Sequence, residues 1–180
     1  MNKKTASQTV LFSTLVITLL ILSLIVWSHF NGGVPSHHLL ANKNLPEISN
    51  WWGLLLLPVA TYLSLNKIKK RIDFEDLSNQ NLKKEFLLPF FIALFYAITM
   101  AIAFQTGNSQ ISSFMFKAVF IIALFVPIYK AEYYLGFIFG LTFTFGGVLP
   151  ILFGLFLIAI SYLIYKYIRS FFIGIKNKIK

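Results

Sequence analysis

The sequence has no cysteine, only 6 acidic residues, and a charged fraction of only 12% over 180 positions. Without cysteine the chain has no disulfide, no thiolate-bound metal and no cysteine nucleophile. A soluble domain with so few charges and 20 Phe would leave most of its surface apolar. The composition therefore indicates a membrane protein, and the hydrophobic content of 57% and the mean hydropathy of +0.74 agree with this.

Six apolar segments fill most of the chain, and most approach the roughly 20 residues that a helical crossing needs. The first is longer than the apolar part of a signal peptide and is therefore read as a retained span. The second is taken to start at Pro46, which suits the first turn of a helix, and the sequence Gly146-Gly147-Val148-Leu149-Pro150 divides the last long stretch. The predicted spans are residues 10–30, 46–65, 86–104, 111–129, 133–146 and 150–168. The predicted fold is a single-domain, all-α polytopic membrane protein, a six-transmembrane-helix bundle.

The distribution of Lys and Arg predicts that both termini are cytoplasmic. With that orientation 14 basic residues lie inside, only Lys43 lies outside, and Lys117 lies within the fourth span. The inside residues are Lys3, Lys4, Lys67, Lys69, Lys70, Arg71, Lys83, Lys84, Lys130, Lys166, Arg169, Lys176, Lys178 and Lys180. Lys outnumbers Arg by 14 to 2, a bias that is typical of proteins from AT-rich bacterial genomes. The predicted location is therefore the bacterial cytoplasmic (inner) membrane.

The predicted outer loop, residues 31–50, holds the richest polar chemistry of the chain. Ser36 is expected to cap a short helix that runs through Asn42, and Pro46 is expected to start the next helix. Pro35 and Pro46 would then hold the loop in a fixed shape between two spans. We therefore expect an ordered loop at the outer surface.

A binding pocket is predicted at the rim of this loop. The candidate ligand-binding residues are His37, His38, Glu47, Trp51 and Trp52. Adjacent histidines on a helix point about 100° apart, so His37 and His38 do not share one metal ion, and neither a metal nor a cofactor is predicted. The alternatives are that these side chains anchor the loop in lipid headgroups, respond to pH, or join His29 in a metal site.

Glycine residues in the last two spans indicate close helix packing. Gly136 and Gly140 form a GxxxG pair, which allows a second backbone to approach, either within this chain or in a dimer. The last apolar stretch is also interrupted at Gly146-Gly147 and Pro150. Transporters often expose backbone to a substrate at such a break in a helix. The predicted packing and helix-break residues are Gly136, Gly140, Gly146, Gly147, Pro150 and Gly154.

The cytoplasmic loop, residues 66–85, mixes basic and acidic residues. Opposite charges one turn apart are expected to pair on a helix that continues past the membrane. The alternative is a surface for anionic lipids or for a partner protein. Short basic clusters between apolar runs are typical of membrane topology signals, so nucleic acid is not expected as a partner.

No recognised catalytic motif occurs in the sequence, so three classes of function stay open. The first is a small channel or transporter for a neutral or anionic solute; it is not an ion pump, because no carboxylate or histidine lies at mid-membrane depth. The second is an accessory or structural subunit, acting as a homo-oligomer or with a partner membrane protein. The third is an enzyme that acts on a lipid or small substrate at the outer leaflet.

Overall fold

The structure is a computed structural model that describes residues 3–34, 36–38, 44, 46–75 and 83–169. Within these residues the chain is helical except for one short antiparallel hairpin and the connecting turns. The α-helices are α1 (Lys3–Phe30), α2 (Gly53–Glu75), α4 (Leu88–Gln105), α5 (Ser109–Phe125), α6 (Ala131–Phe145) and α7 (Val148–Leu163). The hairpin pairs β1 (Ser36–His38) with β2 (Glu47–Ser49), and three short turns of helix are η2 (Asn50–Trp52), η3 (Lys83–Leu87) and η4 (Ile164–Ile168).

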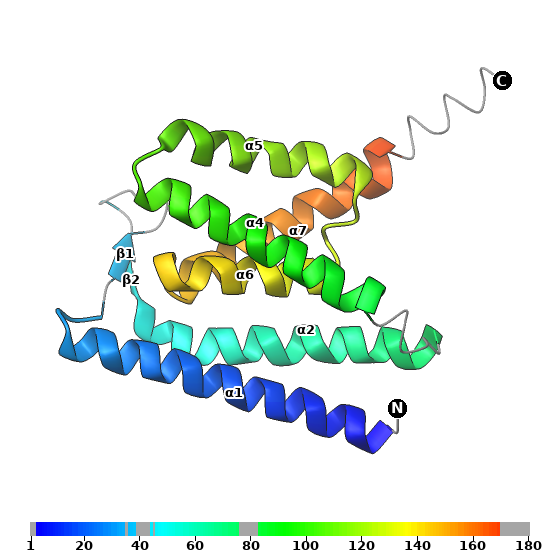
Figure 1. Cartoon of the computed structure of the whole chain (residues 1–180), viewed down its shortest axis with the longest axis horizontal. Helices are drawn as coiled ribbons and strands as arrows, with labels where there is room; N and C mark the ends of the chain where they lie inside the picture. Colours follow the sequence, from blue (N-terminus) through cyan, green and yellow to red (C-terminus); the bar gives the residue numbers. More distant parts are fainter. Residues whose placement is uncertain (1–2, 35, 39–43, 45, 76–82, 170–180) are drawn as a thin grey trace.

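The helices lie side by side in a bundle, and successive helices run in opposite directions (Figure 1). The hairpin, the turn between α4 and α5, and the turn between α6 and α7 lie at one end, which we call the hairpin end. The start of α1 and the end of η4 lie at the opposite end (Figure 1). We call this the basic end, because it carries Arg71, Lys84, Lys130, Lys166 and Arg169.

Three helical segments are long and apolar enough to cross a membrane. They are Ala6–Phe30, Lys84–Gln105 and Val148–Ile168, and α5 is a shorter apolar helix of 17 residues. The last 10 residues of α2, 66–75, carry four basic and two acidic side chains. The structure therefore has the helices of an integral membrane protein, with lengths that differ widely from one helix to the next.

The shortest of these helices, α6, is the core of the bundle. It contacts α2, α4 and α7, and ten of its 15 residues are buried. Leu135 and Ile138 are almost completely buried, at 1% and 0% exposure. Since protein rather than lipid surrounds α6, this helix does not have to match the thickness of a bilayer.

Small residues let α4 and α6 approach closely. Gly136 and Gly140 of α6 face Ala93 and Ala97 of α4; a Cβ atom at Gly140 would lie 2.6 Å from the Ala97 Cβ. At Gly136 the nearest atom would be the Phe90 backbone oxygen, at 2.1 Å. The GxxxG pair therefore packs inside the chain, and the close approach of the two backbones supplies dense van der Waals contact.

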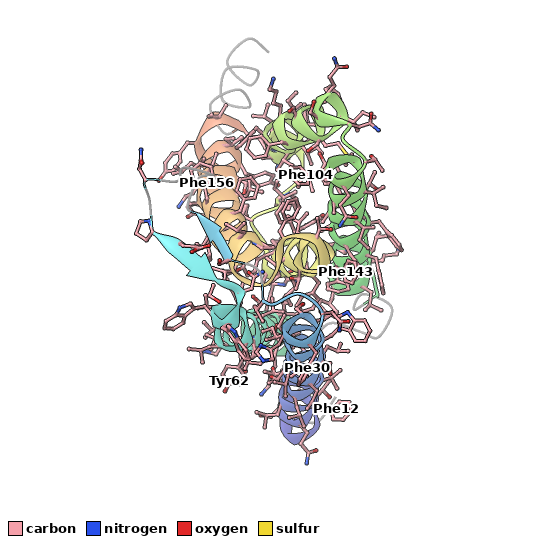
Figure 2. The ribbon with its side chains drawn as sticks, turned by 90° about the vertical axis from the view of Figure 1, so that its left-hand side faces the viewer. Phe12, Phe30, Tyr62, Phe104, Phe143 and Phe156 are labelled. Atoms are coloured by element: carbon pink, nitrogen blue, oxygen red, sulfur yellow. The ribbon has the colours of Figure 1, made fainter. Side chains whose placement is uncertain are left out.

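Large apolar side chains cover the outside of the bundle, as expected for a surface that faces lipid. The side chains labelled in Figure 2 are all exposed, from 43% for Tyr62 to 80% for Phe30. Helix α1 packs mainly against α2 and buries one stripe, which contains Ala6, Val10, Ile21 and Ile25. The rest of its apolar surface is left open to the surroundings.

The start of the second helix differs from the prediction. Pro46 precedes β2, and helix α2 begins at Gly53, after the Ser49 hydroxyl has capped η2 by accepting from the Trp51 amide at 3.3 Å. Residues 36–38 form a strand rather than the expected helix, while residues 39–43 lie outside the described residues. The prediction treats Ser36 and Pro46 as residues that start helices, but Ser36 begins β1 and Pro46 directly precedes β2. Each strand has three residues, which is too short for sequence alternation to reveal.

Candidate functional site

The hairpin brings the predicted loop residues onto one backbone ladder. The register pairs Ser36 with Ser49, His37 with Ile48 and His38 with Glu47. The Ser36 hydroxyl donates a hydrogen bond to the Glu47 carboxylate, and both residues are exposed. Nothing is described of the two histidine side chains, so their role in a pocket stays a prediction.

Trp51 and Trp52 lie in η2, beside this hairpin, and are 46% and 59% exposed. They line a shallow, open hollow together with Ser49, Leu54 and Leu55. All of its described lining residues come from positions 49–55, and Glu47 is not among them. The Trp51 ring also makes an edge-to-face contact with the His29 ring, with the ring centroids 6.1 Å apart. The hollow is thus a surface feature.

Among the described residues, no group of three acidic or histidine side chains is placed to hold a metal ion.

A buried ion pair lies at the basic end of the bundle. Arg71 of α2 donates through Nη1 to both carboxylate oxygens of Glu132, at 3.0 and 3.3 Å. Glu132, in the first turn of α6, has no exposed surface, whereas the Arg71 side chain is 23% exposed. A carboxylate that is removed from water in this way is stable only with a charge-assisted partner, and Arg71 supplies it.

Two further residues extend this pair into an ionic cluster, defined as Arg71, Glu85, Lys130 and Glu132. Arg71 Nη2 donates to the backbone oxygen of Glu85 at 3.3 Å, and Lys130 Nζ lies 3.8 Å from the Glu85 carboxylate. The cluster joins α2, η3 and the start of α6. It therefore fixes the position of α6 relative to η3, the helical turn that leads into α4.

A cavity of about 210 Å³ lies among α4, α5, α6 and α7, and we call it the tyrosine pocket. Its lining is almost entirely apolar, and it is partly open. Its polar side chains are Tyr96, Tyr133, Tyr134 and Ser161. The Tyr96 hydroxyl donates to the Met115 backbone oxygen at 2.5 Å, and the Ser161 hydroxyl donates to Ile158 at 3.1 Å.

The tyrosine pocket and the ionic cluster share one stretch of backbone. Glu132 of the cluster is followed directly by Tyr133 and Tyr134, which line the pocket. The Tyr134 ring packs against Gly154 of α7, where a Cβ atom would lie 2.7 Å from the ring. One turn of α6 thus carries a charged contact on one face and the wall of an apolar cavity on another.

Sequence reasoning missed this arrangement. It assigns Arg71 to the topology signal and to local pairing within residues 66–85, and it places Glu132 in no site. The available signal is that Glu132 is the sole acidic residue between positions 86 and 180 and stands at the start of a segment, residues 133–146, that has no other charge. An acidic residue in that place needs a partner, but a single sequence does not say which of the basic residues it is.

The chain matches no protein-family model, and neither curated proteins nor solved structures show a significant similarity to it.

Proposed function

We propose that this chain is an integral membrane protein that binds an anionic lipid, with part of an acyl chain in the tyrosine pocket and the headgroup at the basic end. The observation that carries the proposal is the position of the pocket: it is apolar, it is partly open, and it lies next to the charged start of α6. Apolar cavities of this kind bind by burial of methylene groups, each worth about 0.8 kcal/mol.

The size of the tyrosine pocket suits part of a lipid acyl chain rather than a polar solute. Its volume of about 210 Å³ lies below the roughly 300 to 1,000 Å³ of pockets for drug-sized ligands, so it holds one segment of a longer molecule. The walls come from side chains such as Ile92, Val119, Ile122 and Leu157. Such walls offer an ion or a sugar no compensation for the loss of water.

The charge at the basic end selects the headgroup. Lys84 and Lys166 are exposed, and Lys130 and Arg169 are half-buried. Basic residues near an anionic membrane surface contribute about 1 kcal/mol each. The Tyr129, Tyr162 and Tyr165 rings cluster at the same end, with centroids 5.3 and 5.6 Å apart, and the Arg169 guanidinium lies 4.4 Å from the Tyr165 centroid. Aromatic and basic side chains together are typical of a membrane–water interface.

Among the three classes that the sequence leaves open, this proposal is nearest to the accessory or structural subunit, to which it adds lipid binding. A channel needs a polar path along the bundle axis, but that axis is occupied by α6 and its buried apolar side chains. The transporter and outer-leaflet enzyme hypotheses stay predictions, because no described feature favours either of them over lipid binding.

The topology that we propose has six membrane crossings, with both termini in the cytoplasm of a bacterial cell and the protein in the inner membrane. The alternating directions of the six helices and the 14-to-1 distribution of basic residues support it. The basic end then faces the cytoplasm, where anionic headgroups attract it.

Two neighbouring isoleucines on α5 provide the test. Ile122 lines the pocket, whereas Ile121 points outward and is 61% exposed. Ile122→Trp fills the cavity, and Ile121→Trp adds the same bulk on the lipid-facing side. In native mass spectrometry we expect the parent and Ile121→Trp to retain phosphatidylglycerol in preference to phosphatidylcholine, and Ile122→Trp to retain at least tenfold less. Equal retention by both variants, or no preference for the anionic lipid in the parent, would contradict the proposal.

A further inference from the structure

Two buried side-chain polar atoms have no hydrogen-bond partner in the described part of the chain: Arg71 Nε and Asn50 Oδ1. The other nitrogens of Arg71 are bonded, as described above. Asn50 lies at the hairpin end, in η2, and is only 6% exposed. A buried acceptor without a partner costs about 1 to 3 kcal/mol, so the position of Asn50 requires an explanation.

Asn50 lines a second cavity, which we call the hairpin-end recess. Its volume is about 230 Å³, and it lies between the last turns of α1 and of α6. Ser28, Thr142 and Thr144 supply the other polar side chains, while Ile21, Ile25 and Phe143 are among the apolar ones. None of its described lining residues is charged, so the recess suits a neutral molecule.

The hydrogen bonds already made in the recess define what is missing. The Thr142 hydroxyl donates its proton to the Ile138 backbone oxygen at 2.6 Å, and the Thr144 hydroxyl accepts from Gln105 Nε2 at 3.1 Å. Asn50 Oδ1 and the lone pairs of Thr142 are therefore acceptors without a donor. A ligand that satisfies Asn50 Oδ1 has to donate a hydrogen bond.

The backbone keeps this side of the recess open for Asn50. A Cβ atom at Gly146 would lie 2.3 Å from Asn50 Oδ1, and Gly146 has a φ of +73°, which side chains other than glycine rarely adopt. Gly147 also lies close to Gly53, since its Cβ would lie 2.8 Å from the Gly53 Cα. The two glycines thus fix the Asn50 amide against the α6–α7 turn without filling the space beside it.

We infer that the hairpin-end recess is a binding site for a neutral hydroxylated ligand, whose hydroxyl donates to Asn50 Oδ1 and whose apolar body packs against Phe143 and α1. The volume is enough for a small alcohol or for the hydroxyl-bearing end of a lipid, and water alone would leave the apolar wall without contacts. This site is separate from the tyrosine pocket, which lies toward the other end of the bundle, so its test is independent of the proposed function.

The test uses two fluorinated probes that differ by one hydroxyl, 4-fluorobenzyl alcohol and 4-fluorotoluene, with the full chain in lipid nanodiscs and empty nanodiscs as the reference. In ¹⁹F NMR titrations we expect the alcohol to bind saturably and at least tenfold more tightly than the toluene. Asn50→Leu keeps a similar volume and removes the acceptor, so it should abolish this preference. No saturable binding of the alcohol, or a preference unchanged in Asn50→Leu, would overturn the inference.

Two serines on α1 give a second, matched pair of variants in case Asn50→Leu does not fold. Ser28 lines the recess, whereas Ser23 is exposed and donates to the Leu19 backbone oxygen. Ser28→Phe should block the alcohol and Ser23→Phe should leave its binding unchanged; equal effects would also overturn the inference. Displacement of the probe by dioleoylglycerol assigns the ligand to a lipid, displacement by free glycerol assigns it to a soluble alcohol, and displacement by neither rejects the ligand class.

Discussion

Arg71 and Glu132 are separated by 61 positions in the sequence, yet their Nη1 and Oε1 atoms lie 3.0 Å apart at the basic end of the bundle. The pair connects the end of α2 to the first turn of the central helix. Because Glu132 is fully buried and Arg71 is partly exposed, the two residues depend on each other unequally. Removal of the arginine leaves a buried charge, whereas removal of the carboxylate leaves a cation that still reaches water.

This inequality gives the first prediction. We expect Arg71→Met to lower the free energy of unfolding by about 3 to 5 kcal/mol and Glu132→Gln to lower it by less, about 1 to 3 kcal/mol. The double variant should cost less than the sum of the two, because neither charge is left alone. Denaturant unfolding in mild detergent, followed by circular dichroism, measures all three, and additive losses would show that the pair is not coupled.

The second prediction concerns the glycines that face backbone and those that face side chains. A methyl group at Gly136 meets the Phe90 backbone oxygen, whereas at Gly154 it meets the Tyr134 ring, which can move. We therefore expect Gly136→Ala to destabilise the protein by about 2 to 3 kcal/mol, and Gly154→Ala by about 1 kcal/mol or less. Thermal melts of the two variants in the same detergent test this order, and the reverse order would mean that α4 and α6 separate easily.

The third prediction concerns the hydrogen bond that ties α5 to the bundle. Tyr96→Phe removes the donor to the Met115 backbone oxygen and should lower stability by about 1 kcal/mol. Hydrogen–deuterium exchange should then rise in α5 and stay unchanged in α6. As a control, Tyr62→Phe alters an exposed tyrosine of α2 and should leave exchange in α5 as it is in the parent.

The fourth prediction tests the proposed topology with single cysteines, which the cysteine-free sequence makes straightforward. Asn108 and Lys84 are both exposed, the first at the hairpin end and the second at the basic end. In sealed cells an impermeant thiol reagent should label Asn108→Cys and should label Lys84→Cys only after lysis. Labelling of Lys84→Cys in intact cells would reject the proposed orientation.

The sequence predicts the helical bundle well where the signal is local. The break at Gly146-Gly147 divides the last apolar stretch at the same place in the structure, where α6 ends at Phe145 and α7 begins at Val148. The GxxxG spacing predicts that Gly136 and Gly140 pack against a second backbone, and in the structure both lie against α4. In these cases glycine marks a constraint on the backbone itself.

The parts that the sequence did not predict depend on long-range contacts. The hairpin forms because residues 36–38 meet residues 47–49, and three-residue strands show no usable alternation. The tyrosine pocket is assembled from four helices, and the Asn50 amide is buried only because the α6–α7 turn closes over it. A single sequence does not contain these pairings in a form that residue patterns reveal.

Helix α1 and helix α5 give the molecule two sides of unequal height. The 28 residues of α1 extend about 42 Å, whereas the 17 residues of α5 extend only about 26 Å, and both helices lie at the edge of the bundle. A bilayer core is about 30 Å thick, so in the proposed six-crossing topology lipid has to thicken or α1 has to tilt on one side, while the acyl chains compress beside α5. In that topology the protein deforms the membrane asymmetrically, and the thinned side is the one beside α5.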